Sequence, residues 1–163
     1  MVYYRNTIDK NKKGFTLVEL IVVIAIIAIL AAIAIPAVIS IVESASVSSI
    51  ETEAAEMDNA CKTYYMGVKS GAISKENFTP TLSGDVVPNR FVSAKTKQTC
   101  AKNCTVGGAL EYNGMYSDLI GKLGEFGYDA EGNIKALGDN ADGTLTQLSL
   151  DGKDTFATLN YAN

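Results

Sequence analysis

The stretch KKGFTLVELIVVIAIIAILAAIAIP, residues Lys12 to Pro36, decides how the rest of this chain is interpreted. It opens a run of 23 uncharged residues from Leu20 to Val42. A helix of that length spans about 34 Å, enough to cross the hydrocarbon core of a bilayer. Lys10, Lys12 and Lys13 precede the run, and basic flanks stay on the cytoplasmic side of a membrane. The sequence therefore predicts an exported, membrane-inserted protein.

Two ordinary explanations compete for this segment. Ala32-Ile33-Ala34 has the small-residue form of a secretory signal cleavage site, and a single-span membrane anchor would have the same apolar length. Neither explains Glu19, because an ionised side chain costs about 2.5–3.5 kcal/mol at the centre of a bilayer. The charge therefore favours a more specific interpretation.

Taken as a whole, residues Lys12 to Pro36 resemble the N-terminus of type IV prepilins. The resemblance implies that a dedicated prepilin peptidase cuts between Gly14 and Phe15, and that the new N-terminal Phe15 is N-methylated. Glu19 and Pro36 match a glutamate and a proline that the family carries at the same spacing. The family's glutamate is thought to neutralise the N-terminal amine of a neighbouring subunit. The match covers about a sixth of the chain, and its short leader resembles the type IVa pattern.

The resemblance implies a structural subunit of a type IV pilus, held in membrane lipid before assembly and in a fibre afterwards. Its expected partners are identical or homologous pilin subunits, the prepilin peptidase and the inner-membrane assembly machinery. Such fibres serve adhesion, twitching motility, aggregation or DNA uptake, and the sequence does not choose among them. Two alternatives remain open: a pseudopilin of a type II secretion or competence system, and a membrane-anchored binding module that does not polymerise.

The expected location follows from the same resemblance. Before assembly the protein crosses the cytoplasmic membrane once with a cytoplasmic N-terminus, and afterwards it lies in an extracellular pilus or an envelope pseudopilus. We divide the chain into a cleaved leader (1–14), an apolar helical half (15–42), an amphipathic helical half (43–69) and a globular head (70–163).

The amphipathic half continues the helix beyond Pro36, which is expected to kink it or melt it locally. Seven residues at alternating spacings of three and four predict one packing face on a helix that ends near Lys69. They are Val47, Ile50, Ala54, Met57, Cys61, Tyr64 and Val68. We expect this face to lie against a sheet.

The remainder predicts an α+β head with an antiparallel sheet of four strands, which gives a pilin-like fold class. One hairpin is expected over 126–137 with a turn at Asp129 to Gly132, and another over 145–159 with a turn at Asp151-Gly152. A short helix is expected from Tyr116 to Leu123, with Ser117 as its N-cap. Residues 72–108 are expected to be irregular, with one strand over 90–94.

Charge and composition argue against two classes of function, nucleic-acid binding and catalysis. The net charge is −4, but the first fourteen residues carry +3, which leaves −7 on the remainder. An acidic body does not predict nucleic-acid binding, which needs clustered lysine and arginine. The chain has no histidine, the usual general base and a frequent metal ligand, so no enzymatic activity is expected.

The cysteines and one acidic loop are the remaining candidates for chemistry. Cys61 is expected either to be a small core residue or to form a disulfide with Cys100 or Cys104. Zinc is not expected, because a thiolate site needs three or four ligands. The loop with Asp139 and Asp142 gives a weak expectation of calcium, but it lacks the EF-hand pattern, and no cofactor is predicted.

Overall fold

The computed structural model describes residues 14–82, 84–138, 140 and 142–160. The chain divides into two compact units, Met1–Ser44 and Ala45–Asn163, and each is described by itself. The basic leader with Lys10, Lys12 and Lys13 lies outside the described residues, and so does Asp139.

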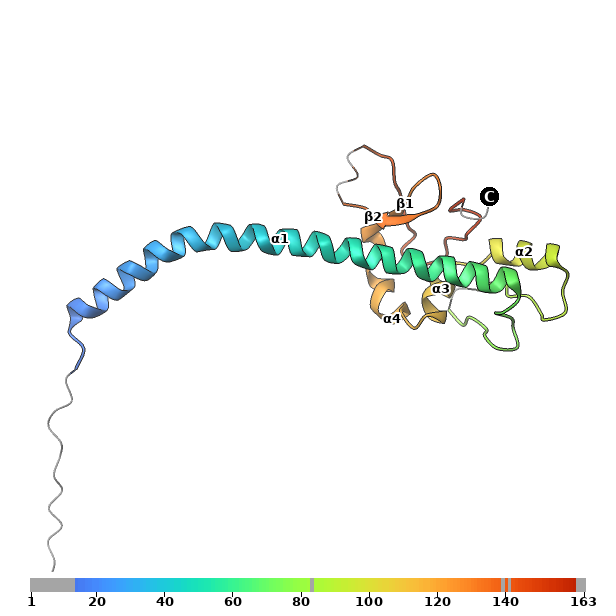
Figure 1. Cartoon of the computed structure of the whole chain (residues 1–163), viewed down its shortest axis with the longest axis horizontal. Helices are drawn as coiled ribbons and strands as arrows, with labels where there is room; N and C mark the ends of the chain where they lie inside the picture. Colours follow the sequence, from blue (N-terminus) through green and yellow to red (C-terminus); the bar gives the residue numbers. More distant parts are fainter. Residues whose placement is uncertain (1–13, 83, 139, 141, 161–163) are drawn as a thin grey trace, which may run out of the picture. The chain divides into compact units, whose positions relative to one another are not determined.

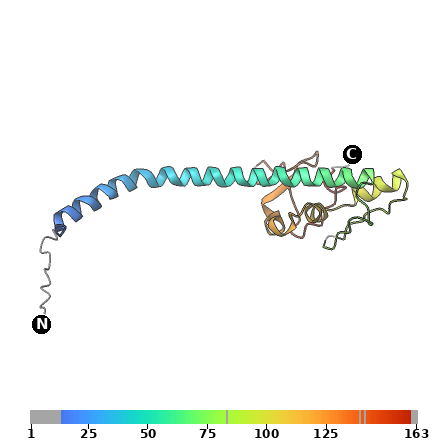
Figure 2. The same cartoon turned by 60° about the horizontal axis from the view of Figure 1, so that its bottom comes forward.

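One helix, α1 (Leu17–Ser70, 54 residues), accounts for all the regular structure described before residue 71 and confirms the predicted long helix. Pro36 lies inside it, and the helix continues on both sides, so the expected local melting is wrong. A proline removes one backbone donor and bends a helix without ending it when the flanking turns are strong helix formers. Figures 1 and 2 show that the blue, N-terminal part of α1 is curved.

The C-terminal part of α1 supplies one wall of the hydrophobic core of the second unit. Its buried residues are Ala54, Met57, Ala60, Cys61, Tyr64, Tyr65 and Val68. The predicted stripe is confirmed from Ala54 onward, and Ala60 and Tyr65 widen it. Val47 is wrongly included, because 56% of its surface is exposed, and Ile50 is only partly buried. The core therefore begins about two helical turns later than the spacing alone predicted.

An aromatic cluster joins three distant segments to α1. The Tyr64 ring lies 5.5 Å from that of Tyr112, 6.0 Å from Phe78 and 6.4 Å from Phe156, measured between centroids. Edge-to-face and tilted contacts at these separations are the favourable arrangements for aromatic rings. Tyr64 thereby connects the long helix to the segments that contain Phe78, Tyr112 and Phe156.

Two short helices occupy the region that was predicted to be irregular: α2 (Ala94–Lys102) and α3 (Val106–Tyr112). The predicted strand over 90–94 is wrong. Side-chain N-caps start both helices, since Ser93 accepts from the Thr96 N–H and Thr105 accepts from the Gly108 N–H. Gly107 and Gly108 at the start of α3 have low helix propensity, so the sequence did not predict this helix. Burial against the core stabilises it.

The predicted helix over 116–123 is present in two pieces. A single α-turn, α4 (Tyr116–Leu119), is followed by a 3₁₀ helix, η1 (Ile120–Glu125). Ser117 is not the N-cap. Its hydroxyl donates to Asp118 Oδ1 at 3.2 Å, and Met115 occupies the cap position without a side-chain bond.

The sheet has three antiparallel strands in the order β2-β1-β3, and Figure 1 labels β1 and β2. They are β1 (Phe126–Tyr128), β2 (Ile134–Ala136) and β3 (Thr146–Gln147). The hairpin of β1 and β2 confirms the first predicted hairpin, with Gly127 opposite Lys135. The long helix and this sheet confirm the α+β, pilin-like fold class.

The second predicted hairpin is wrong. β3 pairs with β1, while residues 156–160 form turns and Thr155 makes only an isolated bridge to Thr105. Backbone bonds explain the difference, because Val106 N–H donates to Asp154 O and Phe156 N–H donates to Cys104 O, each at 2.9 Å. The C-terminal segment therefore binds to the connection between α2 and α3, which places the side chain of Phe156 in the core.

Candidate functional site

The predicted processing site lies at the N-terminal end of α1. Phe15 is 90% exposed, and the space around the Cα of Gly14 is open, with no atom within 4 Å of where a β-carbon would stand. The helix begins two residues after Phe15, at Leu17. The Gly14–Phe15 peptide is therefore accessible and lies outside regular structure, as a protease substrate requires.

Thr16 and Glu19 form a capping box at the start of α1. The Thr16 N–H and its hydroxyl both donate to Glu19 Oε2 at 2.8 Å, and the Glu19 N–H donates to Thr16 Oγ1 at 3.2 Å. Two backbone donors that a helix leaves unsatisfied at its N-terminus are paired in this way. Sequence reasoning assigned Glu19 a role between subunits and missed this local one, although Thr-x-x-Glu before an apolar run is its signature.

The capping box leaves Glu19 partly engaged. Both donors from Thr16 go to Oε2, and Oε1 accepts no bond from the described residues. A carboxylate has about four lone-pair sites, so Oε1 is available to a further donor.

The apolar half of α1 presents large hydrophobic side chains on all sides. Its most apolar 18-residue window is 0% buried, and by length and composition the helix could cross a membrane. Leu17 and Ile33, for example, are 74% and 72% exposed. Contiguous apolar surface of this extent is rare on soluble monomers and marks a membrane or protein interaction surface. Pro36 lies within this segment.

The three cysteines are buried, free thiols in the structure. Burial raises the pKa of the Cys61 and Cys104 thiols, which disfavours the reactive thiolate. Cys104 Sγ donates to the Cys100 carbonyl at 3.4 Å, and Cys61 lies in the core of the head. The disulfide between Cys61 and Cys100 or Cys104 stays a prediction.

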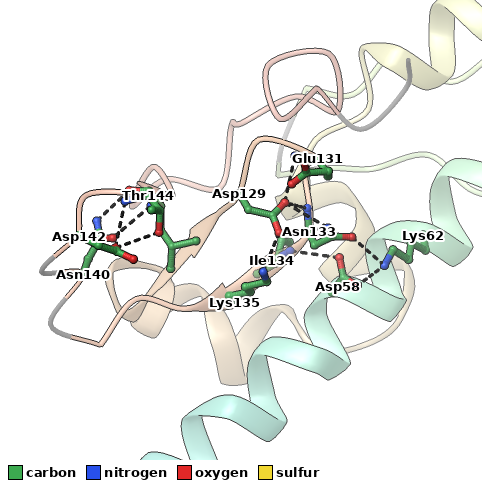
Figure 3. Close-up of polar contacts among 11 residues, drawn as sticks. Asp58, Lys62, Asp129, Glu131, Asn133, Ile134, Lys135, Asn140, Asp142 and Thr144 are labelled. Atoms are coloured by element: carbon green, nitrogen blue, oxygen red, sulfur yellow. Dashed lines mark hydrogen bonds and ion pairs between the residues drawn. The ribbon is translucent and has the colours of Figure 1, made fainter.

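A polar network holds the β1–β2 hairpin to α1 (Figure 3). Asp129 Oδ1 accepts from the Asn133 N–H at 2.8 Å, and Asp129 Oδ2 pairs with Lys135 Nζ at 2.8 Å. On α1, Asp58 accepts from the Ile134 N–H at 3.2 Å and pairs with Lys62. Burial alone would raise the pKa of Asp129, but hydrogen bonds from Lys135 and Asn133 outweigh it and lower the pKa to about 2.

The loop that contains Asp142, where calcium was considered, is held by hydrogen bonds between its own residues. Asp142 Oδ1 accepts from the Thr144 N–H at 3.1 Å and from the Thr144 hydroxyl at 2.9 Å, and these bonds lower the pKa of Asp142. Asn140 bonds both backbone groups of Leu145. Within the described part of the chain no three Asp, Glu, Cys or His side chains gather as a metal would need. Because Asp139 lies outside that part, calcium at Asp139 and Asp142 stays a prediction.

Comparison with known proteins gives one match. Residues 9–35 match the family described as the prokaryotic N-terminal methylation motif. No curated protein and no solved structure matches the chain. The matched segment contains Gly14, Phe15 and Glu19, and it marks residues 9–35 as a type IV prepilin-like leader and the start of the helix that follows it.

Proposed function

We propose that this chain, which carries a type IV prepilin-like leader, is the precursor of a structural subunit of a type IV pilus or a related filament. Prepilin peptidase cleaves it after Gly14, and Phe15 becomes an N-methylated N-terminus. The mature subunits polymerise through the apolar half of α1. The observation that carries the proposal is the methylation motif, which extends into an apolar helical segment that the described residues leave uncovered.

The uncovered segment explains why assembly would be favourable. Large apolar side chains cover its whole circumference, so the segment needs lipid or similar helices around it. Subunits inserted through the same segment are parallel, because their basic flanks all lie on the cytoplasmic side. Parallel copies of one apolar helix can leave the bilayer together when each covers its neighbours.

Glu19 is proposed to neutralise the amine of Phe15 on a neighbouring subunit. Oε2 is engaged with Thr16, whereas Oε1 accepts no bond from the described residues. An ammonium donor in an apolar bundle would find there the acceptor that both charges require, because unpaired charges are costly in such surroundings. Before cleavage the Phe15 nitrogen belongs to a peptide bond and carries no charge. Subunits would therefore assemble only after cleavage has created the charged amine that Glu19 pairs with.

The first test is the N-terminus of the mature protein. We expect mass spectrometry of protein from the cell envelope to find a chain that begins at N-methylated Phe15. A chain that begins near Ile35 would instead mark an ordinary signal peptide, and an intact Met1 would mark a plain anchor. Either result would refute the proposed processing.

The second test separates the two roles of Glu19. Glu19→Gln keeps the capping box, since glutamine also serves at that position, but removes the charge. We expect the variant to enter the membrane normally and to lose at least nine-tenths of its fibres in sheared surface fractions. Glu43→Gln, also an exposed glutamate of α1, is the matched control and should assemble. Normal fibres from Glu19→Gln would refute charge neutralisation.

A further inference from the structure

Two adjoining hollows run between α1 and the edge strand β2. The larger, about 440 Å³, is lined mainly by Glu51, Ala54 and Asp58 of α1 and by residues 133–136. The smaller, about 190 Å³, is lined by Val47, Ile50, Glu125, Ala136 and Gly138. The two share Ala136, and all their lining residues belong to the second unit. We call them together the α1/β2 groove.

The groove has an apolar floor, and its lining carries Glu51, Asp58 and Glu125 together with one lysine, Lys135, which is paired with Asp129. Val47 is 56% exposed and Ile50 is only partly buried, so no part of the described head covers this end of the predicted stripe. Glu51 and Glu125 are exposed, and neither forms an ion pair with any described residue. Strand β2 borders the groove and pairs only with β1, so one of its edges is open. Such a surface suits an apolar group accompanied by positive charge.

The same head carries a group of that kind. Phe91 is 92% exposed, the most exposed large apolar side chain among the described residues. Arg90 precedes it and Lys95 follows on α2. Lys62, Lys122, Lys135 and Lys153 all form ion pairs, whereas five lysines of the described chain form none. These are Lys69, Lys75, Lys95, Lys97 and Lys102, which lie near Phe91 in the sequence. The described lysines that form no ion pair therefore all lie between residues 69 and 102, although Lys69 lies over the Tyr65 ring and Lys97 donates to the Ser70 carbonyl.

Phe91 cannot reach the groove of its own chain. Lys97 Nζ lies 3.5 Å from the carbonyl of Ser70, so α2 lies beside the C-terminal end of α1. Ile50 is twenty residues earlier on the same helix, which corresponds to about 30 Å. Figure 1 shows α2 and β2 at opposite ends of the head. Phe91 could therefore enter such a groove only on another molecule.

We propose that Phe91 and Lys95 of one subunit dock in the α1/β2 groove of a second copy of this chain. The ring would cover the floor at Val47 and Ile50, and the lysine would face Glu51 or Glu125. The contact joins two different surfaces, so it is heterologous and does not close a dimer. Repetition of a heterologous contact builds an open fibre. The inference rests on the proposed function and adds a contact between heads to it.

The test is disulfide trapping between copies. Ala136→Cys, which lines both hollows, and Ala94→Cys, an exposed position between Phe91 and Lys95, are combined in one full-length chain, so that Phe91 and Val47 stay in place and the native cysteines are buried. Under mild oxidation we expect a ladder of dimers and higher species, from fibres and from concentrated protein in neutral detergent. The matched control combines Ala94→Cys with Leu150→Cys, because Leu150 is 71% exposed but does not line the groove. It should give at least tenfold less cross-linked product.

Repeating the trap with Glu19→Gln added separates this contact from the proposed function. If fibres disappear but the ladder persists in concentrated detergent solution, the docking contact exists independently of helix bundling. If wild-type fibres never form but the ladder appears, the filament proposal fails and the docking contact survives. If the 94–136 pair gives no ladder, or no more than the control pair, the docking contact is refuted.

Charge gives a second, independent readout. Lys95→Glu should lower cross-linking of the 94–136 pair at least fivefold at low salt, and adding Glu51→Lys and Glu125→Lys should restore it. Lys153→Glu, a change of equal charge at a lysine that is already paired, should leave cross-linking unchanged. The proposed partner would be overturned if Lys95→Glu and Lys153→Glu lowered cross-linking equally. It would also be overturned if the Lys95 region bound a DNA duplex in place of the second copy.

Discussion

The two halves of α1 share one secondary structure and differ in what surrounds them. In the N-terminal half nearly every large side chain is exposed, whereas Met57, Tyr64 and Val68 of the C-terminal half are fully buried. The first half is apolar around its circumference, and the second has one apolar face. A helix with one apolar face can be satisfied by its own chain. A helix that is apolar on all sides requires surroundings that the chain does not supply.

The largest expected effect is on the core that covers the second half. Phe156→Ala should lower the free energy of unfolding of the head by about 3–5 kcal/mol, because the ring is 0% exposed and packs on Tyr64 and Tyr65. Urea unfolding of the full-length protein in neutral detergent, followed by tyrosine fluorescence, measures it.

Phe91→Ala and Ile33→Ala are the matched controls. Phe91 is the same residue type but exposed, and Ile33 lies in the uncovered half of α1. Each should change the unfolding free energy by no more than about 0.5 kcal/mol. A loss of several kcal/mol from Ile33→Ala would mean that the two halves unfold together.

A smaller effect is expected where the hairpin is bonded to α1. The folded-state pKa of Asp129 is about 2, below its usual value of 3.8, so the carboxylate stabilises the fold above pH 4 and loses that contribution as the pH falls toward 2. Asp129→Asn should remove on the order of 1 kcal/mol at pH 7 and much less at pH 2. Urea unfolding at several pH values compares it with the parent.

The control for this prediction is Asp151→Asn, at an exposed turn where Asp151 pairs with Lys153. Its effect should be smaller at every pH, because an exposed ion pair is weakened by solvent. An Asp129→Asn loss that is equal at pH 7 and pH 2 would show that the carboxylate's charge is not responsible.

The smallest effect concerns a loop that a single carboxylate holds. Glu111 of α3 accepts from the Thr81 N–H at 3.0 Å, from its hydroxyl at 2.7 Å and from the Leu82 N–H at 3.3 Å. Burial alone would raise the pKa of Glu111, but these bonds outweigh it and lower the pKa. Glu111→Gln keeps an acceptor and should cost only about 0.5 kcal/mol.

Limited proteolysis is the sensitive readout for Glu111→Gln. The variant should be cleaved several times faster near Leu82, with urea unfolding changed little. Glu125→Gln, an exposed glutamate that forms no ion pair with a described residue, should be cleaved at the parent's rate. Equal cleavage of all three proteins would contradict the role of Glu111 in holding this loop.

The elements that the sequence predicted are those whose stabilising contacts are local or strongly periodic. The long helix followed from an uninterrupted apolar run and a stripe at three and four residues. The hairpin of β1 and β2 followed from a turn in which Asp129 bonds the backbone of Asn133. The prepilin-like leader followed from a contiguous motif over residues 9–35 that needs no tertiary structure to be recognised.

The elements that sequence reasoning missed depend on contacts between distant segments. Residues 155–159 have strand-like composition, but Phe156 bonds the backbone of Cys104 and packs on Tyr64, so the segment turns into the core. α3 contains two glycines and forms because its caps and its burial offset their low helix propensity. Ser117 was predicted to be an N-cap, but the helix begins at Tyr116. Local sequence does not define a helix boundary to within one residue.

By itself, the sequence determined the membrane-length helix, the prepilin-like leader with Glu19 at its fixed spacing, and the α+β class, since each rests on local order along the chain. The tertiary structure decided where the core begins on α1, which strand pairs with β1, and that Phe91 and the α1/β2 groove are left uncovered at opposite ends of the head. Burial and strand pairing join residues far apart in the chain, and periodicity along one segment carries no information about which distant segment will cover it.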